Sequence, residues 1–93
     1  MTTLTKTAPA TVIIPPIPEN WIARSAIIIK DGLLPYCIVV RDSGSQYHPF
    51  VCHRACVGEN DKGEPEWNYM YGNYSSTREG AMKYFEERTA GWP

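Results

Sequence analysis

Hydrophobic residues in this chain occur in short runs separated by polar turns, a spacing typical of a small β-rich domain. The run at 22–30 ends at Asp31 and Gly32, a pair that strongly favours a two-residue hairpin turn. The run that follows, 33–41, is apolar on both faces over most of its length. This pattern predicts two antiparallel strands, and because both faces of the second are apolar, something should cover each of them.

Two more strands and a helix are expected further along the chain. The segment 42–46 has the Asp, Ser and Gly composition of a turn. A third strand is predicted at 47–57, and the polar loop 58–66 separates it from a fourth strand at 67–74. The fourth strand is the most aromatic part of the chain and leads directly into the start of a helix.

The helix start is marked by Ser76-Thr77-Arg78-Glu79, which fits a capping box. In that motif the Ser76 hydroxyl accepts a hydrogen bond from the amide of Glu79, and the Glu79 carboxylate reaches back to the amide of Ser76. Apolar residues recur at helical spacing after it, and Gly91 ends the run. The pattern predicts a terminal helix of about three and a half turns.

Four strands in meander order followed by one helix predict an α+β domain, in which an antiparallel sheet carries the C-terminal helix on one face. Residues 21–91 form this single domain, and residues 1–20 form a Pro-rich and Thr-rich N-terminal arm. Helix and central strand are excluded from the arm because proline lacks an amide N–H. Its apolar residues predict that part of it docks on its own domain, on a second copy or on a partner, and the first is the simplest arrangement. These residues are Val12, Ile13, Ile14 and Ile17.

Side-chain alternation along the predicted fourth strand places Trp67, Tyr69 and Tyr71 on one face. The other face carries Asn68, Met70, Gly72 and Tyr74. Because a helix approaches a sheet most closely over a small residue, the position of Gly72 predicts that the helix covers the face that carries Met70, Gly72 and Tyr74. The three aromatic rings then lie on the open face, where they form a candidate surface for a partner protein or for a homodimer. The alternatives are that these rings form the core under the helix, or that the N-terminal arm covers them.

The balance of charge is close to neutral, with nine basic and ten acidic side chains and a net charge of −1. Such a chain lacks the positive surplus that favours phosphate backbones, so nucleic acid is not the expected partner. Four acids around the loop before the fourth strand could present carboxylates to a basic groove of a partner protein, or could simply be solvated. These acids are Glu59, Asp61, Glu64 and Glu66.

The residues that could support metal or thiol chemistry are Cys37, His48, Cys52, His53 and Cys56. An odd number of cysteines does not make a disulfide framework, and free thiols packed as small apolar residues fit a cytoplasmic location. On a strand, residues four apart lie about 13 Å from each other, too far to share one metal ion. We therefore predict no metal site and no cofactor. A short helix at 49–58 is the alternative, because it would bring His48, Cys52 and Cys56 to one face and would permit a small metal-binding protein.

Other functional signals are missing from the chain. No run approaches the roughly 18 apolar residues of a membrane span. There is no glycine-rich phosphate loop, no nucleophile elbow and no metal-binding histidine pair on a helix. We therefore expect a non-enzymatic binding protein with no catalytic residue and no membrane partner. A single-stranded nucleic-acid-binding module is the alternative, in which Trp67, Tyr69 and Tyr71 stack bases beside Arg41 and Arg54.

A resemblance sharpens this expectation. The chain combines a short meander containing Tyr47-His48-Pro49-Phe50-Val51 with Gly72-Asn73-Tyr74, which feeds a helix that carries the residues Glu79-Gly80-Ala81-Met82-Lys83-Tyr84-Phe85. In size and layout, over about residues 33–88, it resembles small accessory proteins of phages and prophages. Several of these are inhibitors of host defence, including anti-CRISPR proteins. The resemblance implies a phage-encoded inhibitor that blocks a larger host protein, such as a CRISPR or other defence nuclease complex, by occupying its surface. It transfers no functional residue to this chain.

Overall fold

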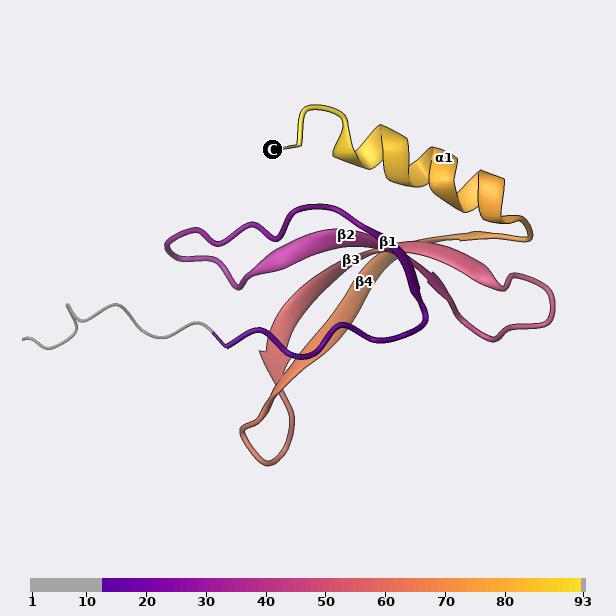
Figure 1. Ribbon diagram of the computed structural model, residues 1–93. Coiled ribbons are helices and arrows are strands. Elements are labelled where there is room, and N and C mark those ends of the chain that lie inside the picture. The colour runs from indigo at the N-terminus through magenta and orange to yellow at the C-terminus, as the bar shows by residue number, and fades with distance from the viewer. Residues whose placement is uncertain (1–12, 93) are drawn as a thin grey trace, which may run out of the picture.

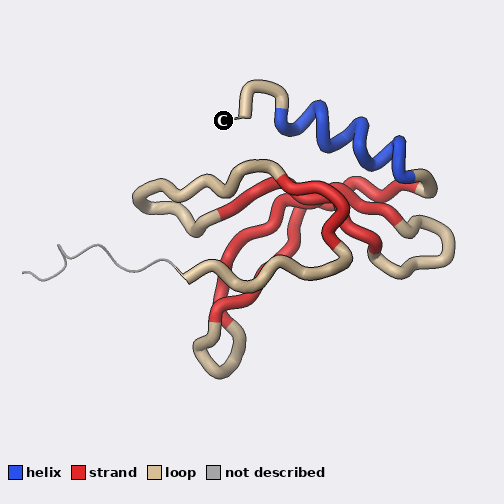
Figure 2. Tube along the Cα trace, in the orientation of Figure 1, coloured by secondary structure: helices blue, strands red, loops and turns tan. Residues whose placement is uncertain are grey.

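The computed structural model describes residues 13–92, and residues 1–12 of the predicted arm lie outside them. The elements are β1 (Trp21–Arg24), β2 (Tyr36–Asp42), β3 (Phe50–Glu59), β4 (Pro65–Ser75) and α1 (Arg78–Thr89). The strands form one antiparallel sheet in the order β1-β2-β3-β4, and α1 lies across one face of it (Figures 1 and 2). The predicted α+β meander with a C-terminal helix is therefore confirmed.

Strand β1 is shorter than the predicted strand at 22–30 and ends at Arg24. The next residue, Ser25, is buried, and both its amide and its hydroxyl bond to the backbone of Ile38, at 2.9 and 2.8 Å. Because the hydroxyl replaces a backbone partner there, the ladder stops, and only a single bridge, between Ile28 and Tyr36, forms further on. The turn predicted at Asp31 and Gly32 is present, but no continuous hairpin ladder leads into it.

Strand β3 occupies the segment for which a short helix at 49–58 was the alternative, so that alternative is wrong. It pairs with both neighbours, for example through Val39 opposite His53 and Cys52 opposite Asn73. Its Phe and Val residues are typical strand formers, and the ladders to β2 and β4 pair its backbone groups on both sides.

Helix α1 begins one residue later than the capping box predicted. Thr77 is the N-cap, and its hydroxyl accepts a hydrogen bond from the amide of Gly80 at 3.0 Å. The hydroxyl of Ser75, the last residue of β4, accepts from the amide of Thr77 at 3.2 Å. Strand β4 therefore determines where the first turn begins, and Ser76 lies between the two elements.

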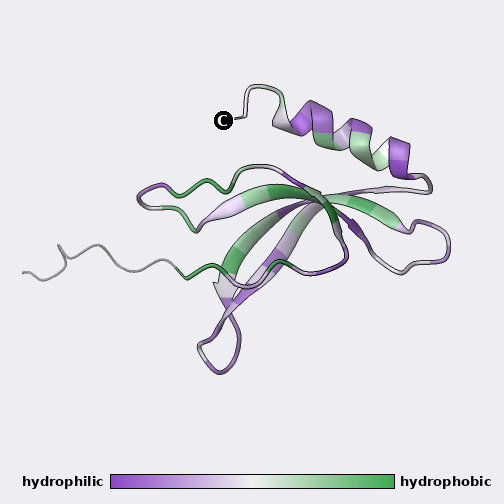
Figure 3. Ribbon diagram, in the orientation of Figure 1, coloured by the Kyte–Doolittle hydropathy of each residue, from purple (hydrophilic) through white to green (hydrophobic). Residues whose placement is uncertain are grey.

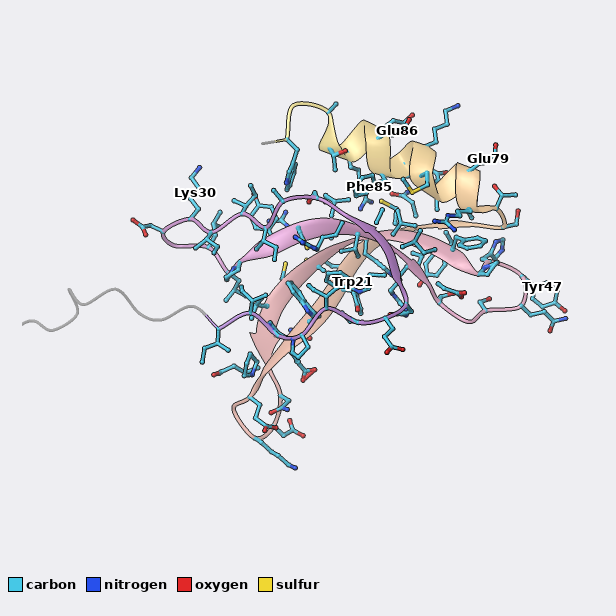
Figure 4. The ribbon with its side chains drawn as sticks, viewed as in Figure 1. Trp21, Lys30, Tyr47, Glu79, Phe85 and Glu86 are labelled. Atoms are coloured by element: carbon cyan, nitrogen blue, oxygen red, sulfur yellow. The ribbon has the colours of Figure 1, made fainter. Side chains whose placement is uncertain are left out.

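The sheet is covered on both faces, as the apolar pattern of β2 predicted. On the helix-side face, residues of the sheet and of α1 form a buried cluster, with Phe85 pointing from α1 toward the sheet (Figure 4). This cluster consists of Ile38, Val40, Cys52 and Ala81. On the opposite face, which we call the arm-side face, the cluster consists of Cys37, Val39 and Ala55. Figure 3 shows the resulting pattern, with hydrophobic residues concentrated in the central strands and along one side of the helix.

Residues 13–20 run along the arm-side face, on the side of the sheet away from α1 (Figure 1). The predicted docking of the arm on its own domain is thus observed for its described part. In residues 13–92, no helix combines the length and apolar character that crossing a membrane requires.

Candidate functional site

A β-bulge divides strand β4 at Tyr71. Arg54 pairs with Met70 and Cys52 pairs with Asn73, so two residues of β4, Tyr71 and Gly72, lie opposite the single residue between Cys52 and Arg54 on β3. Tyr71 has a φ of +55°, in the left-handed region that side chains other than glycine adopt at a cost. Because one residue is added, the side-chain alternation of the strand reverses beyond the bulge.

The C-terminal part of α1 holds this bulge in place. The guanidinium of Arg88 donates hydrogen bonds to the backbone carbonyl of Tyr71 and to the side-chain oxygen of Asn73. Arg88 lies in the last turn of the helix, where a cation also interacts favourably with the helix dipole. The two ends of α1 therefore have different contacts with β4. The helix begins directly after the strand, and Arg88 near its C-terminal end fixes the irregular backbone at the bulge.

Trp67 and Tyr69 lie on the arm-side face, as predicted, but this face is not open. The ring of Trp21 packs 4.9 Å from that of Trp67, and its Nε1–H donates to the Tyr69 hydroxyl at 2.9 Å. The Nε1–H of Trp67 donates to the carbonyl of Pro16 at 3.2 Å. Figure 4 shows Trp21 on the side of the sheet opposite Phe85. The arm and β1 therefore cover these two rings, which was one of the alternatives to an open face.

The bulge overturns the predicted placement of three other residues. Tyr71 does not lie beside Trp67 and Tyr69 but lines the same groove as Met70, and the residue is 69% exposed. Gly72, predicted under the helix, instead faces the His53 ring on the arm-side face. Tyr74, predicted with Gly72 under the helix, lies on the arm-side face as well, 6.1 Å from His53. A strict period of two cannot describe a strand with an inserted residue, although a glycine inside a strand is itself a signal of a bulge.

The outer edge of β4 and the loop beside it expose apolar side chains that sequence reasoning did not select. Met70, next to Tyr71, is 38% exposed, and Tyr74, three residues beyond Tyr71, is 56% exposed. Between β4 and the loop after the Asp31 turn lies a groove of about 360 Å³. Its lining residues are Gly32, Leu33, Leu34, Arg54, Cys56, Met70 and Tyr71. We call this the β4 groove.

Arg54 supplies the positive charge of the β4 groove. Its guanidinium stacks over the ring of Tyr36 at 3.9 Å, and Tyr36 in turn meets the edge of Trp92 at 5.8 Å between centroids. The buried Nε of Arg54 has no hydrogen-bond partner among the described residues. A held guanidinium beside exposed leucines, methionine and tyrosine is suited to a carboxylate flanked by apolar groups.

His53 is the buried titratable residue of the arm-side face. It is 4% exposed, its ring lies 5.0 Å from that of Tyr69, and neither ring nitrogen has a hydrogen-bond partner among the residues that the structure describes. Burial, together with the positive charges of Arg41 and Arg88, lowers the pKa of His53 to about 4. The imidazole is therefore neutral near pH 7.

The structure distributes the candidate metal and thiol residues over both faces of the sheet and the loop before β3. Cys52 packs on the helix-side face, while Cys37 and His53 belong to the arm-side face, and His48 is exposed in the loop before β3. Within residues 13–92, no three His, Cys, Asp or Glu side chains gather in a metal-binding arrangement. Burial raises the pKa of the Cys37 thiol to about 11 and also raises the pKa of Cys52. These thiols are packed as neutral groups.

The stacking platform of the nucleic-acid alternative is not assembled in this structure. Arg41 stacks over Tyr69 at 4.5 Å on the arm-side face, whereas Arg54 lies on the helix-side face over Tyr36. Trp67 is covered and Tyr71 is displaced by the bulge. The five residues therefore do not present one continuous surface to a base stack.

The acidic residues Glu59, Asp61, Glu64 and Glu66 surround the tip of the β3–β4 hairpin, which extends away from the rest of the sheet (Figure 1). Asn60 orders this tip, because its side-chain oxygen accepts hydrogen bonds from the amides of Lys62 and Glu64 at 2.8 and 3.0 Å. The side chains of Glu59, Asp61 and Glu64 are exposed, and Glu66 is half-buried. The tip thus presents carboxylates on an ordered turn.

Comparisons with known proteins found no similarity: the chain matches no protein-family model, no curated protein and no solved structure.

Proposed function

We propose that this protein is a non-enzymatic inhibitor that binds a larger protein and blocks it by occupying its surface. The observation that carries the proposal is the β4 groove, in which exposed apolar side chains surround Arg54, a cation without an acidic partner in the groove lining. Exposed apolar residues grouped around a held charge are typical of protein interaction sites.

The partner chemistry follows from the groove. Leu33, Leu34 and Tyr71 favour an apolar or aromatic side chain of the partner, and Arg54 favours a neighbouring carboxylate. The acidic hairpin tip supplies a second contact of opposite sign, suited to a basic groove of the kind that binds nucleic-acid phosphates. A surface with these two parts would compete with both protein and nucleic-acid ligands of a nuclease complex.

The class of partner comes from the resemblance to small phage and prophage proteins. We propose a host defence protein, such as a CRISPR or other defence nuclease complex, as the target, with the inhibitor acting in the cytoplasm of the host. A second copy of this chain is the other protein partner that the exposed edge of β4 admits.

An infection assay tests this function. Production of the protein in a bacterial strain with an active CRISPR or restriction system is expected to restore plaque formation by a phage that the system otherwise excludes. Leu34→Asp and Tyr71→Asn should abolish the rescue, since they place polar groups in the β4 groove. Asparagine tolerates the left-handed backbone of position 71.

The matched control is Tyr47→Asn. Tyr47 is also exposed but lies at the far end of the molecule, in the loop between β2 and β3 (Figure 4). This variant should rescue plaque formation as well as the unaltered protein. If all variants rescue plaque formation equally, the β4 groove is not the binding site. If the unaltered protein gives no rescue in any strain with an active defence system, the inhibitor function is contradicted.

A further inference from the structure

We propose that the outer edge of β4 pairs with the same edge of a second copy of this chain, so that the two four-stranded sheets join into one. Strand β4 is the last strand of the sheet, and it is the longest, with 11 residues. An unpaired strand edge carries a row of backbone donors and acceptors that another extended strand can satisfy.

The hydrogen bonds at the base of the hairpin show which backbone groups face outward. The amide of Asn60 donates to the carbonyl of Glu64 at 2.8 Å, and the amide of Val57 donates to the carbonyl of Pro35, on the β2 side, at 2.9 Å. Hydrogen-bonded and non-hydrogen-bonded pairs alternate in an antiparallel ladder. Both observations therefore make Val57 and Trp67, and likewise Ala55 and Tyr69, non-hydrogen-bonded pairs of the β3–β4 ladder. The N–H and C=O groups of Trp67 and Tyr69 point away from β3 and use no other hydrogen bond among the described residues.

Twofold symmetry then restricts the register. In an isologous antiparallel pair, each outward-facing residue must meet another outward-facing residue. Centring the pair on Asn68 places Trp67 of each copy opposite Tyr69 of the other. All N–H and C=O groups of these two residues are then used, and four backbone hydrogen bonds result.

The neighbouring registers are worse for identifiable reasons. Centring on Trp67 places Tyr69 opposite Pro65, which has no amide to donate. Centring on Glu66 places two carboxylates directly opposite each other. Centring on Tyr69 requires Trp67 to pair with Tyr71, whose backbone is turned by the bulge and whose carbonyl is already bonded to Arg88.

The side chains agree with the Asn68-centred register. On the arm-side face, a Trp67 ring lies next to a Tyr69 ring across the new ladder, a favourable aromatic pair. On the helix-side face, Glu66 lies opposite Met70, so no like charges meet. Arg54 on β3 is paired with Met70. Glu66 of the second copy, Met70 and Arg54 therefore lie in one row across three neighbouring strands, with the carboxylate and the guanidinium at its two ends.

Such a dimer is closed. The remaining outer edge of each sheet is β1, which has only four residues and does not extend the pairing further. Both α1 helices lie on the same face, because the twofold axis passes through the sheet at Asn68. The dimer does not depend on the inhibitory function, and its test uses no host protein.

Disulfide trapping tests the register. The two Asn68 residues form a non-hydrogen-bonded pair, whose Cα atoms are about 4.5 Å apart in an antiparallel ladder, within the range that a disulfide can bridge. Asn68→Cys is therefore expected to give a covalent dimer under mild oxidation of the native protein. Ser45→Cys, in an exposed loop, is the matched control and should remain largely monomeric. The natural cysteines are all buried, but Cys56 lies directly opposite position 68 in the β3–β4 ladder and would compete by forming an intramolecular disulfide, so both variants also carry Cys56→Ser.

Sedimentation supplies a second readout that needs no covalent bond. The unaltered protein should sediment as a dimer, and Asn68→Lys and Asn68→Asp should each sediment as monomers, because two like charges then meet on the axis. Mixing these two variants should restore a dimer, and Ser45→Lys should leave the dimer unchanged. A monomeric natural protein up to millimolar concentration would falsify the proposal. It also fails if Asn68→Cys crosslinks no faster than Ser45→Cys, or if Asn68→Lys keeps the dimer mass.

Discussion

The imidazole of His53 packs directly over Gly72, where an added Cβ would lie 3.1 Å from two atoms of the ring. Gly72 is the second residue of the β4 bulge, and His53 is the buried residue of β3 that faces it. The bulge therefore makes room for the buried histidine, because the inserted residue brings glycine, which has no side chain, against the imidazole ring.

Gly72→Ala is expected to destabilise the fold by about 1–3 kcal/mol, because the ring is held between Tyr69 and Tyr74 and has little room to move. Urea denaturation measures the change. In the double variant with His53→Ala, the cost of Gly72→Ala should decrease, since the ring that meets the new methyl group most closely is gone and only the contact with Tyr74, at 3.2 Å, remains. Additive effects would show that the contact with His53 is not the cause.

Stability should fall between pH 6.5 and pH 4 through His53. Its pKa is lowered to about 4 in the folded protein, from an ordinary value of 6.5. The unfolded chain therefore binds more protons in this window, and the free energy of unfolding decreases as the pH falls. The upper bound is about 3 kcal/mol, reached near pH 4.

Comparing pH series of the natural protein and His53→Phe isolates this contribution, because the acidic residues titrate in both. Above pH 6.5, the free energies of unfolding of the two proteins should differ by a constant amount. Below pH 6.5, the natural protein should lose more stability than His53→Phe as the pH falls. Parallel curves throughout the range would show that His53 does not carry the dependence.

The aromatic residues of β4 should differ sharply in their effect on stability. Trp67→Ala is expected to cost about 2–4 kcal/mol, because Trp67 packs against Trp21 and bonds to Pro16. Tyr71→Asn should change stability by less than about 0.5 kcal/mol, since its side chain is exposed. Thermal unfolding of both variants checks this, and equal losses would contradict the assignment of one ring to the core and the other to the surface.

The start of α1 offers a matched pair of neighbouring hydroxyl residues. Thr77→Ala should cost about 1 kcal/mol, because the Gly80 amide loses its acceptor. Ser76→Ala should be close to neutral, since Ser76 is exposed and is not the N-cap. Denaturant titration of the two variants measures the difference. If Ser76→Ala instead lowers the free energy of unfolding more than Thr77→Ala, then Ser76 is the N-cap, as the sequence motif predicts.

Some features of this protein follow from residues that are near each other in the chain. The succession of apolar runs and turns determined the order of four strands and a helix, because strand and helix periodicities are local properties. The apolar character of both faces of β2 determined that the sheet is covered on both sides.

Other features depended on contacts between distant residues. The hydroxyl of Ser25 ended β1 by bonding to Ile38, and Arg88 on α1 held the bulge at Tyr71. Each of these contacts joins parts of the chain that no local pattern relates. A single inserted residue then exchanged the faces of Gly72 and Tyr74 and separated Tyr71 from Trp67 and Tyr69, which the arm and β1 cover. The sequence by itself determined which elements form, and only the tertiary structure decided which aromatic rings the protein exposes, because register and bulges are set by packing across the sheet.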